Sequence, residues 1–372
     1  MFIFLCLFIV GCGNGKKEID NEDFLETKTT ENCIDEKIKL SLEYNPKTDS
    51  PRGYDWGYMS ESENGYFFGD NFWISYWDKE SGMYVPLCSN PDCEHMTKDC
   101  LAYNHKKDTS LIISPYYYGG YVYEVGNEKK EDGVYVNLYR IKEDGSEFEQ
   151  YYTFLKADDS HNARTPELCF HRGYLYYVIP FQTSMKLYRV KLGEDKPEIV
   201  YEMSGERQNL YRIKAYGNHV FFQAGNFVDD KMMDINAGIY EYDITTKEIK
   251  SVMNGAIREY GVYGNSLYYC KDNGIYELNF TDMSSKLTID NVGNEQRVIF
   301  GEEKIIIWNN GSVINIYEYD GKKIAEVPKG DVRWIKGINN NILFGATSTN
   351  IAYYDITSDD KKWKVLDLGI DI

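Results

Sequence analysis

One pattern occurs seven times along this 372-residue chain and limits what it can fold into. A short apolar strand, usually led by glycine or asparagine, is followed roughly a dozen residues later by a strand that carries a tyrosine. The apolar strands centre on Phe67, Val122, Leu175, Val220, Leu267, Ile305 and Ile342. The partner tyrosines are Tyr84, Tyr139, Tyr188, Tyr240, Tyr276, Tyr317 and Tyr353. Repeats of this length, built from short strands and tight turns, are typical of a β-propeller.

The fourth unit displays the internal plan of the repeat. Its pattern predicts strands at 211–216, 219–223, 238–244 and 248–253, joined by short polar turns. On the third strand, Glu241 and Asp243 share one face with Ile239, and we expect these carboxylates to serve the turn and the solvent. Four antiparallel strands per unit predict an all-β, seven-bladed propeller, with six or eight blades as the alternative. Long loops are expected at 127–133, 156–166 and 226–237, where propeller ligands commonly bind.

The charge of the chain excludes one class of partner. The formal net charge is −18, whereas nucleic-acid binding needs clustered lysine and arginine. Such a charge keeps a protein soluble. It is also compatible with attraction of a cationic partner or of divalent ions.

The first residues indicate where the protein resides. Met1–Val10 is apolar throughout, but it is too short to span a bilayer, which needs about 20 residues. Residues 7–12 read Leu-Phe-Ile-Val-Gly-Cys and resemble a bacterial lipobox. That resemblance implies that Cys12 carries a lipid anchor. We therefore expect a lipoprotein signal peptide at 1–11, a flexible acidic tether at 12–35 and the propeller domain at 36–372. Within that domain, a strand at 37–44 is expected to clasp the ring near its seam or to lie across one face.

A cysteine- and histidine-rich loop at 88–100 is the one local cluster with distinctive chemistry. Cys88, Cys93, His95 and Cys100 lie within thirteen residues, and zinc accepts three thiolates and one imidazole in a tetrahedral site. Pro91 presets a tight turn between the first two thiols. A disulfide staple is an equally weighted alternative, because exported proteins meet oxidants. A redox or catalytic site is a third interpretation. A structural zinc ion is thus the one cofactor that the sequence suggests.

Taken together, the lipobox, the tyrosine-bearing repeats and the cysteine loop resemble uncharacterised lipid-anchored propeller lipoproteins of clostridial bacteria. The resemblance covers residues 12 to 372. It implies a fold and a location on the outer face of the cell membrane. It implies no reaction.

The remaining candidates for chemistry are isolated. The histidines outside the loop are expected to be solvated, and two of them could face a propeller mouth together with Arg164; the four are His105, His161, His171 and His219. Cys169 and Cys270 lie in apolar strands and are expected to be small core residues. No nucleophile elbow, zinc-protease helix, Walker loop or dinucleotide-binding loop occurs.

We therefore interpret the chain as a cell-surface lipoprotein whose propeller binds or scaffolds a protein, peptide or glycan, rather than as an enzyme. The alternative is a carbohydrate-active lyase or glycosidase outside the cell. Exposed aromatic rings stack on sugars, and two carboxylates can suffice for hydrolysis.

Overall fold

The computed structural model describes residues 45, 47–50, 59–69, 73–95, 97, 99–103, 114–158, 163–180, 184–205, 208–227, 235–255 and 257–368. All of these residues belong to the unit Lys37–Ile372. The predicted signal peptide, the lipidation site Cys12, the acidic tether and the strand expected at 37–44 lie outside the described residues, as do His105 and His161.

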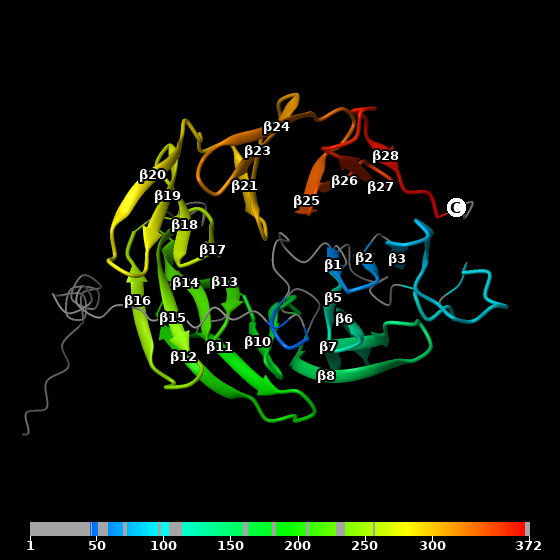
Figure 1. Ribbon diagram of the computed structural model, residues 1–372. Helices are drawn as coiled ribbons and strands as arrows, with labels where there is room; N and C mark the ends of the chain where they lie inside the picture. The colour runs from blue at the N-terminus through cyan, green and yellow to red at the C-terminus, as the bar shows by residue number, and fades with distance from the viewer. Residues whose placement is uncertain are drawn as a thin grey trace, which may run out of the picture. The chain divides into compact units, whose positions relative to one another are not determined.

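The first three blades contain twelve strands (Figure 1). Blade 1 consists of β1 (Met59–Glu61), β2 (Gly65–Gly69), β3 (Ile74–Asp78) and β4 (Tyr84–Pro86). Blade 2 consists of β5 (Tyr116–Tyr118), β6 (Tyr121–Lys130), β7 (Gly133–Lys142) and β8 (Phe148–Ala157). Blade 3 consists of β9 (Glu167–His171), β10 (Tyr174–Val178), β11 (Ser184–Lys191) and β12 (Glu198–Ser204).

The other four blades follow the same plan. Blade 4 consists of β13 (Gln208–Tyr216), β14 (His219–Phe227), β15 (Ile235–Asp243) and β16 (Ile249–Met253). Blade 5 consists of β17 (Tyr260–Tyr263), β18 (Ser266–Lys271), β19 (Gly274–Asn279) and β20 (Ser285–Asp290). Blade 6 consists of β21 (Arg297–Phe300), β22 (Lys304–Trp308), β23 (Val313–Glu318) and β24 (Lys323–Pro328). Blade 7 consists of β25 (Trp334–Asn339), β26 (Ile342–Ala346), β27 (Ile351–Asp355) and β28 (Lys364–Val365).

These sheets confirm the predicted seven-bladed, all-β propeller. In each sheet the four strands pair antiparallel in chain order. The apolar centres of the repeat lie on the second strand of each blade, and six of the seven tyrosines lie on the third. Tyr84 is the exception, because it lies on the fourth strand β4, and the third strand of blade 1 carries Tyr76 instead.

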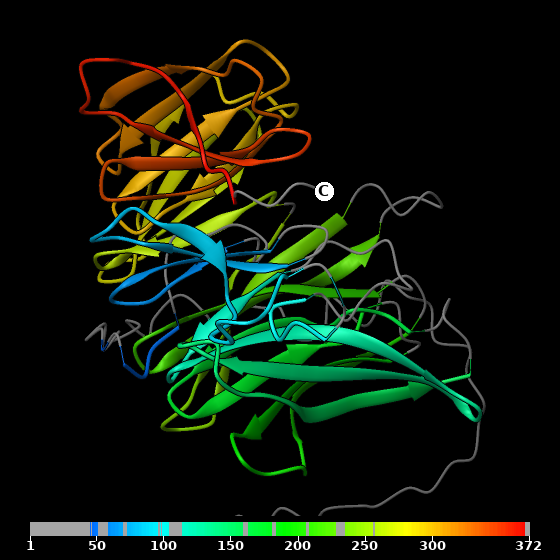
Figure 2. The same cartoon turned by 90° about the vertical axis from the view of Figure 1, so that its right-hand side faces the viewer.

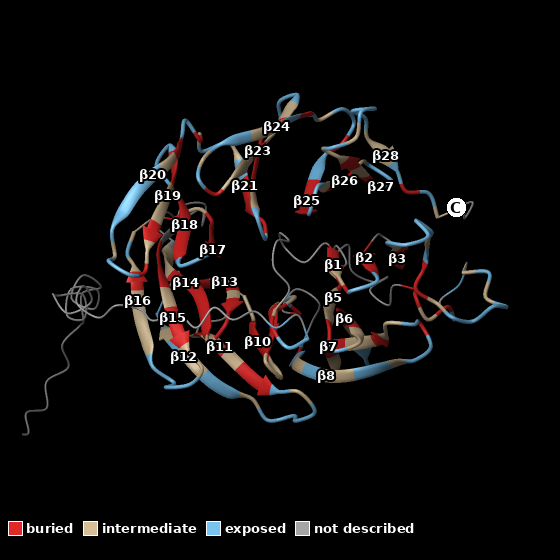
Figure 3. Cartoon of the chain, in the orientation of Figure 1, coloured by how far each residue is buried: buried red, intermediate tan, exposed pale blue. Residues whose placement is uncertain are grey.

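Seven apolar clusters hold the blades together, and each one joins two neighbours. Blades 2 and 3, for example, share a cluster that contains Leu138 and Phe170, and blades 4 and 5 share one that contains Phe221 and Phe280. The remaining clusters join blades 1 and 2, 3 and 4, 5 and 6, 6 and 7, and 7 and 1. Burial is concentrated in these seams, while outer strands such as β20 and β24 are largely exposed (Figure 3). A sheet face that one blade cannot bury alone is therefore covered by the next.

Side chains alone close the ring between the described strands of blades 7 and 1. Phe344 of β26 is fully buried, and its ring lies 4.7 Å from that of Tyr66 and 5.6 Å from that of Trp77. The Asn339 amide of β25 donates to the Glu61 carboxylate of β1. No described strand of blade 1 joins the sheet of blade 7, so this seam depends on packing rather than on a shared strand.

Two hairpins differ from the prediction. The segment expected as a long loop at 127–133 is mostly strand, because β6 ends at Lys130 and β7 begins at Gly133. At 226–237, the first two residues belong to β14 and the last three to β15, and residues 228–234 lie outside the described residues. The long strands of blades 2 and 3 run beside one another in Figure 2.

Within the described residues, no helix has the length and apolarity needed to cross a bilayer.

Candidate metal centre

The loop at 88–100 leaves blade 1 after β4 and returns to the same blade. At its start, the Leu87 amide donates to the Ile74 carbonyl at 2.8 Å, and after its end the Ile74 amide donates to the Ala102 carbonyl at 2.8 Å. Trp73 and Tyr103 form a further antiparallel bridge. Both ends of the loop are therefore pinned at the start of β3.

The structure brings the four predicted ligand residues together. One ligand atom from each of Cys88, Cys93, His95 and Cys100 lies within 4.8 Å of the other three. His95 Nδ1 and Cys100 Sγ lie 3.3 Å apart. All three thiols are free in the structure. Three sulfurs and one ring nitrogen at these separations match the donor set that zinc takes in structural sites.

Backbone hydrogen bonds shape the loop around this cluster. The Cys93 amide donates to the Asn90 carbonyl at 3.2 Å, which closes the tight turn predicted at Pro91. His95 has a φ of 56°, a left-handed conformation that only a minority of non-glycine residues adopt. The Trp73 indole donates to the His95 carbonyl at 2.7 Å. The backbone of His95 is therefore constrained, and it directs the imidazole toward the thiols.

The ionisable groups of the cluster differ in their pKa values. Burial acts to raise the pKa of Cys88, but hydrogen bonds from the backbone amides of Asn90 and Leu101 and from the thiols of Cys100 and Cys93 outweigh it and lower that pKa. Burial raises the pKa of Cys100 to about 12 and lowers the pKa of His95. A lower pKa favours the thiolate at Cys88 and the neutral imidazole at His95. These are the forms in which the two side chains bind metal. A bound dication would favour the thiolate at Cys100 as well.

The loop also covers the seam between blades 1 and 2. Cys100 is buried in the apolar cluster that contains Phe67 of blade 1 and Val122 of blade 2. The Ser89 amide donates to the carbonyl of Gly145, in the β7–β8 turn of blade 2, at 3.1 Å. A Cβ atom on Gly145 would lie only 2.9 Å from the Cys88 nitrogen. The cluster therefore stands where two blades meet.

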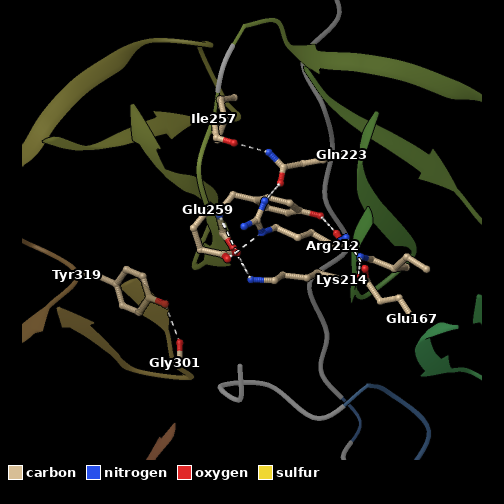
Figure 4. Close-up of polar contacts among 10 residues, drawn as sticks. Glu167, Arg212, Lys214, Gln223, Ile257, Glu259, Gly301 and Tyr319 are labelled. Carbon is tan, nitrogen blue, oxygen red and sulfur yellow. Dashed lines mark hydrogen bonds and ion pairs between the residues drawn. The ribbon is translucent and has the colours of Figure 1, made fainter. Parts of the chain in front are cut away.

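A second polar cluster, which the sequence did not single out, joins the first strands of blades 3, 4 and 5 (Figure 4). Glu259, just before β17, accepts from the Arg212 guanidinium and from the Lys214 ammonium at 2.9 Å each. Glu167 of β9 accepts from the backbone amides of Arg212 and Ile213 at 2.9 and 2.6 Å. These contacts support a bulge in β13 at which Arg212 has a φ of 54°.

Two carboxylates in this cluster have pKa values shifted in opposite directions. Burial raises the pKa of Glu167 despite its two amide donors. Burial also acts on Glu259, but the charges of Arg212 and Lys214 outweigh it and lower that pKa. Both carboxylates are already engaged by neighbouring blades. The cluster therefore serves to connect blades.

The remaining sequence candidates separate into confirmed and corrected predictions. Cys169 and Cys270 are buried as expected, and burial raises the pKa of each to about 12. His171 and His219 were expected to be solvated, but both are buried. The His171 ring accepts from the Ser50 amide at 2.9 Å and contacts the Gly217 carbonyl at 2.7 Å. His171 thus contacts Ser50 and blade 4, and His219 contacts Glu241 of β15, partners that periodicity alone does not reveal.

Comparison with known proteins supports the fold and no specific activity. No protein-family model and no curated protein matches this chain. Prolyl oligopeptidase B from Galerina marginata is similar at 11% identity with a TM-score of 0.51, over 87% of this chain and 52% of that one. An oligogalacturonate lyase in complex with manganese has 11% identity and a TM-score of 0.47, over 83% and 85%. BamB from Moraxella catarrhalis has 10% identity and a TM-score of 0.45, over 82% and 98%. The chain thus spans about half the length of the peptidase.

Proposed function

We propose that this protein is a lipid-anchored surface lipoprotein whose propeller is a rigid binding or scaffold domain for a protein, peptide or glycan. The observation that carries the proposal is the paired state of the ionic groups on the inner strands. Glu259 and Glu167 are engaged by the neighbouring blade 4, and Glu61 by blade 7. Groups occupied in this way stiffen a scaffold and are poorly placed for proton transfer to a substrate. No contact among the described residues favours the carbohydrate-active alternative.

A structural zinc ion completes the proposal. Cys88, Cys93, His95 and Cys100 are its ligands, and a full set of four protein donors leaves no open position for substrate. The ion stabilises the loop and, through Ser89 and Gly145, the seam between blades 1 and 2. This choice of metal over a disulfide rests on four donors that converge, where a disulfide would use only two.

Metal analysis of the full chain, purified in detergent, tests the zinc site. We expect about one zinc per chain, and Cys93→Ser should abolish it and lower the melting temperature. Cys270→Ala removes a buried thiol outside the loop and should leave the zinc content unchanged. A protein without zinc, whose denatured thiol count rises on reduction, would instead support the disulfide staple.

Two further experiments test the location and the role. Cys12→Ser should release the protein from the membrane fraction and remove labelling by a fatty-acid analogue, because that thiol is the proposed acylation site. Glycan and peptide arrays probed with the wild-type chain should give a saturable ligand. Turnover of an oligosaccharide, measured on the same glycans, would contradict the scaffold role.

A further inference from the structure

Three ligand-type side chains meet at one end of blade 4, far along the chain from the cysteine loop. His219 is the first residue of β14, and Asp243, the last residue of β15, is its partner in the strand register. Glu241 lies two residues before Asp243 and therefore points to the same face. One ligand atom from each of the three lies within 4.8 Å of the other two.

His219 and Glu241 form a buried pair in this group, and Asp243 lies beside them. His219 and Glu241 are each only 3% exposed, and His219 Nδ1 contacts the Glu241 carboxylate directly. Asp243 is half-buried, and its Oδ1 accepts from the amides of Thr245 and Thr246 at 2.7 and 3.1 Å. Among the residues that the structure describes, no lysine or arginine forms an ion pair with either carboxylate. Glu241 therefore depends on its contact with His219, and a bound cation would add a compensating charge beside this buried carboxylate.

The propeller repeat supplies an internal comparison. The residue equivalent to His219, the first of the second strand, is Gly65, Tyr121, Tyr174, Ser266, Lys304 or Ile342 in the other blades. The residue equivalent to Glu241 is Tyr76, Arg140, Arg189, Glu277, Ile316 or Tyr353. Only blade 4 combines an imidazole with two carboxylates. The blade fold does not need this combination, since six other sequences form the same hairpin.

We propose that His219, Glu241 and Asp243 bind a divalent first-row transition cation, such as Mn²⁺ or Co²⁺, at a second metal site. One imidazole and two carboxylates are ligands that these cations accept, whereas the three thiols of the cysteine loop favour zinc. Asp243 can keep its hydrogen bonds from the turn amides and still bind a cation, because a carboxylate has a second oxygen. Three protein ligands leave coordination positions open to water or to a bound molecule. This proposal does not rest on the proposed function, because it requires neither the lipid anchor nor a macromolecular ligand.

The probes are Mn²⁺ and Co²⁺, each titrated into the full chain in detergent. Mn²⁺ binding is followed by loss of the free-ion paramagnetic resonance signal. Co²⁺ at this site should give weak visible bands without the sulfur-to-cobalt charge transfer that the cysteine loop would produce. His219→Ala and Glu241→Gln should weaken binding of both ions at least about tenfold, since even loss of a supporting hydrogen bond commonly costs that much. Neither variant should change the zinc content.

Asp243→Asn and Asp355→Asn form a matched pair. Asp355 ends β27 as Asp243 ends β15, and its Oδ1 accepts from the Thr357 amide at 2.8 Å, but it faces Ile342 instead of a histidine. Asp243→Asn should weaken Mn²⁺ binding, and Asp355→Asn should not. The proposal is overturned if neither ion binds, or if binding is unchanged in His219→Ala. If His219 and Glu241 form only a buried hydrogen-bonded pair, His219→Ala should lower the stability of the protein without changing metal binding.

Discussion

Replacing Glu259 by glutamine tests whether the polar cluster of Figure 4 connects the blades. Glutamine keeps the shape of the side chain but removes the charge that Arg212 and Lys214 share. The Glu259 side chain is only 11% exposed, while those of its two partners are 21% and 26% exposed. Breaking a fully buried pair costs about 3–5 kcal/mol, and partial exposure of the cations reduces this, so we expect a loss of about 2–4 kcal/mol.

Chemical denaturation of the full chain, followed by tryptophan fluorescence, measures this loss. Glu149→Gln is the matched control, because Glu149 also pairs with an arginine, Arg140, across two strands, but its side chain is 55% exposed. The control should lose less than about 1 kcal/mol. A loss in Glu259→Gln no larger than in the control would refute the inference that this cluster stabilises the ring.

The same variant makes a prediction about pH. The pKa of Glu259 is lowered in the folded protein from its ordinary value of 4.5, so the ionised carboxylate stabilises the fold at neutral pH. That contribution is fully present above about pH 4.5 and is lost as the pH falls through the lower, folded pKa. The difference between wild type and Glu259→Gln should therefore be constant near pH 7 and shrink in acid. A difference in stability that grows as the pH falls would contradict a lowered pKa for Glu259.

Two further substitutions test the seams. Phe344→Ala should destabilise the protein by about 3–5 kcal/mol, because it removes a buried ring from the cluster that joins blades 7 and 1. A loss below about 1 kcal/mol in chemical denaturation would mean that this seam is not closed by packing. Gly145→Ala should cost about 1–3 kcal/mol and reduce zinc occupancy, because φ is +72° and the new Cβ meets the Cys88 backbone. Its control is Gly173→Ala, where φ is +79° but no atom lies within 4 Å, so that only the conformational cost remains and zinc is retained.

The cysteine loop was predictable from sequence because its ligands are close along the chain. Residues 88–100 can converge through local turns alone, and Pro91 marks one of them. The choice between metal and disulfide was not predictable, since both use the same thiols. The structure adds the placement of the loop at a seam, where Cys100 is buried between blades.

The second ligand group was missed for the opposite reason. His219 and Glu241 are 22 residues apart, and alternation along β15 placed Glu241 on a face that was expected to be solvated. That face is covered by the seam with blade 5, which contains Phe221 and Ile239. Periodicity identifies two faces of a strand, but it does not determine which face a neighbouring blade covers.

The order of short strands and tight turns, repeated seven times, was sufficient to determine the architecture, because each blade is built from contiguous sequence and its hairpins are local. The tertiary structure alone decided which charges are paired, as in the contacts of Arg212 with Glu259 and of Asn339 with Glu61. Those partners belong to different repeats, 47 and 278 residues apart. Such pairings depend on how the ring closes, and ring closure is a property of the packed blades as a whole.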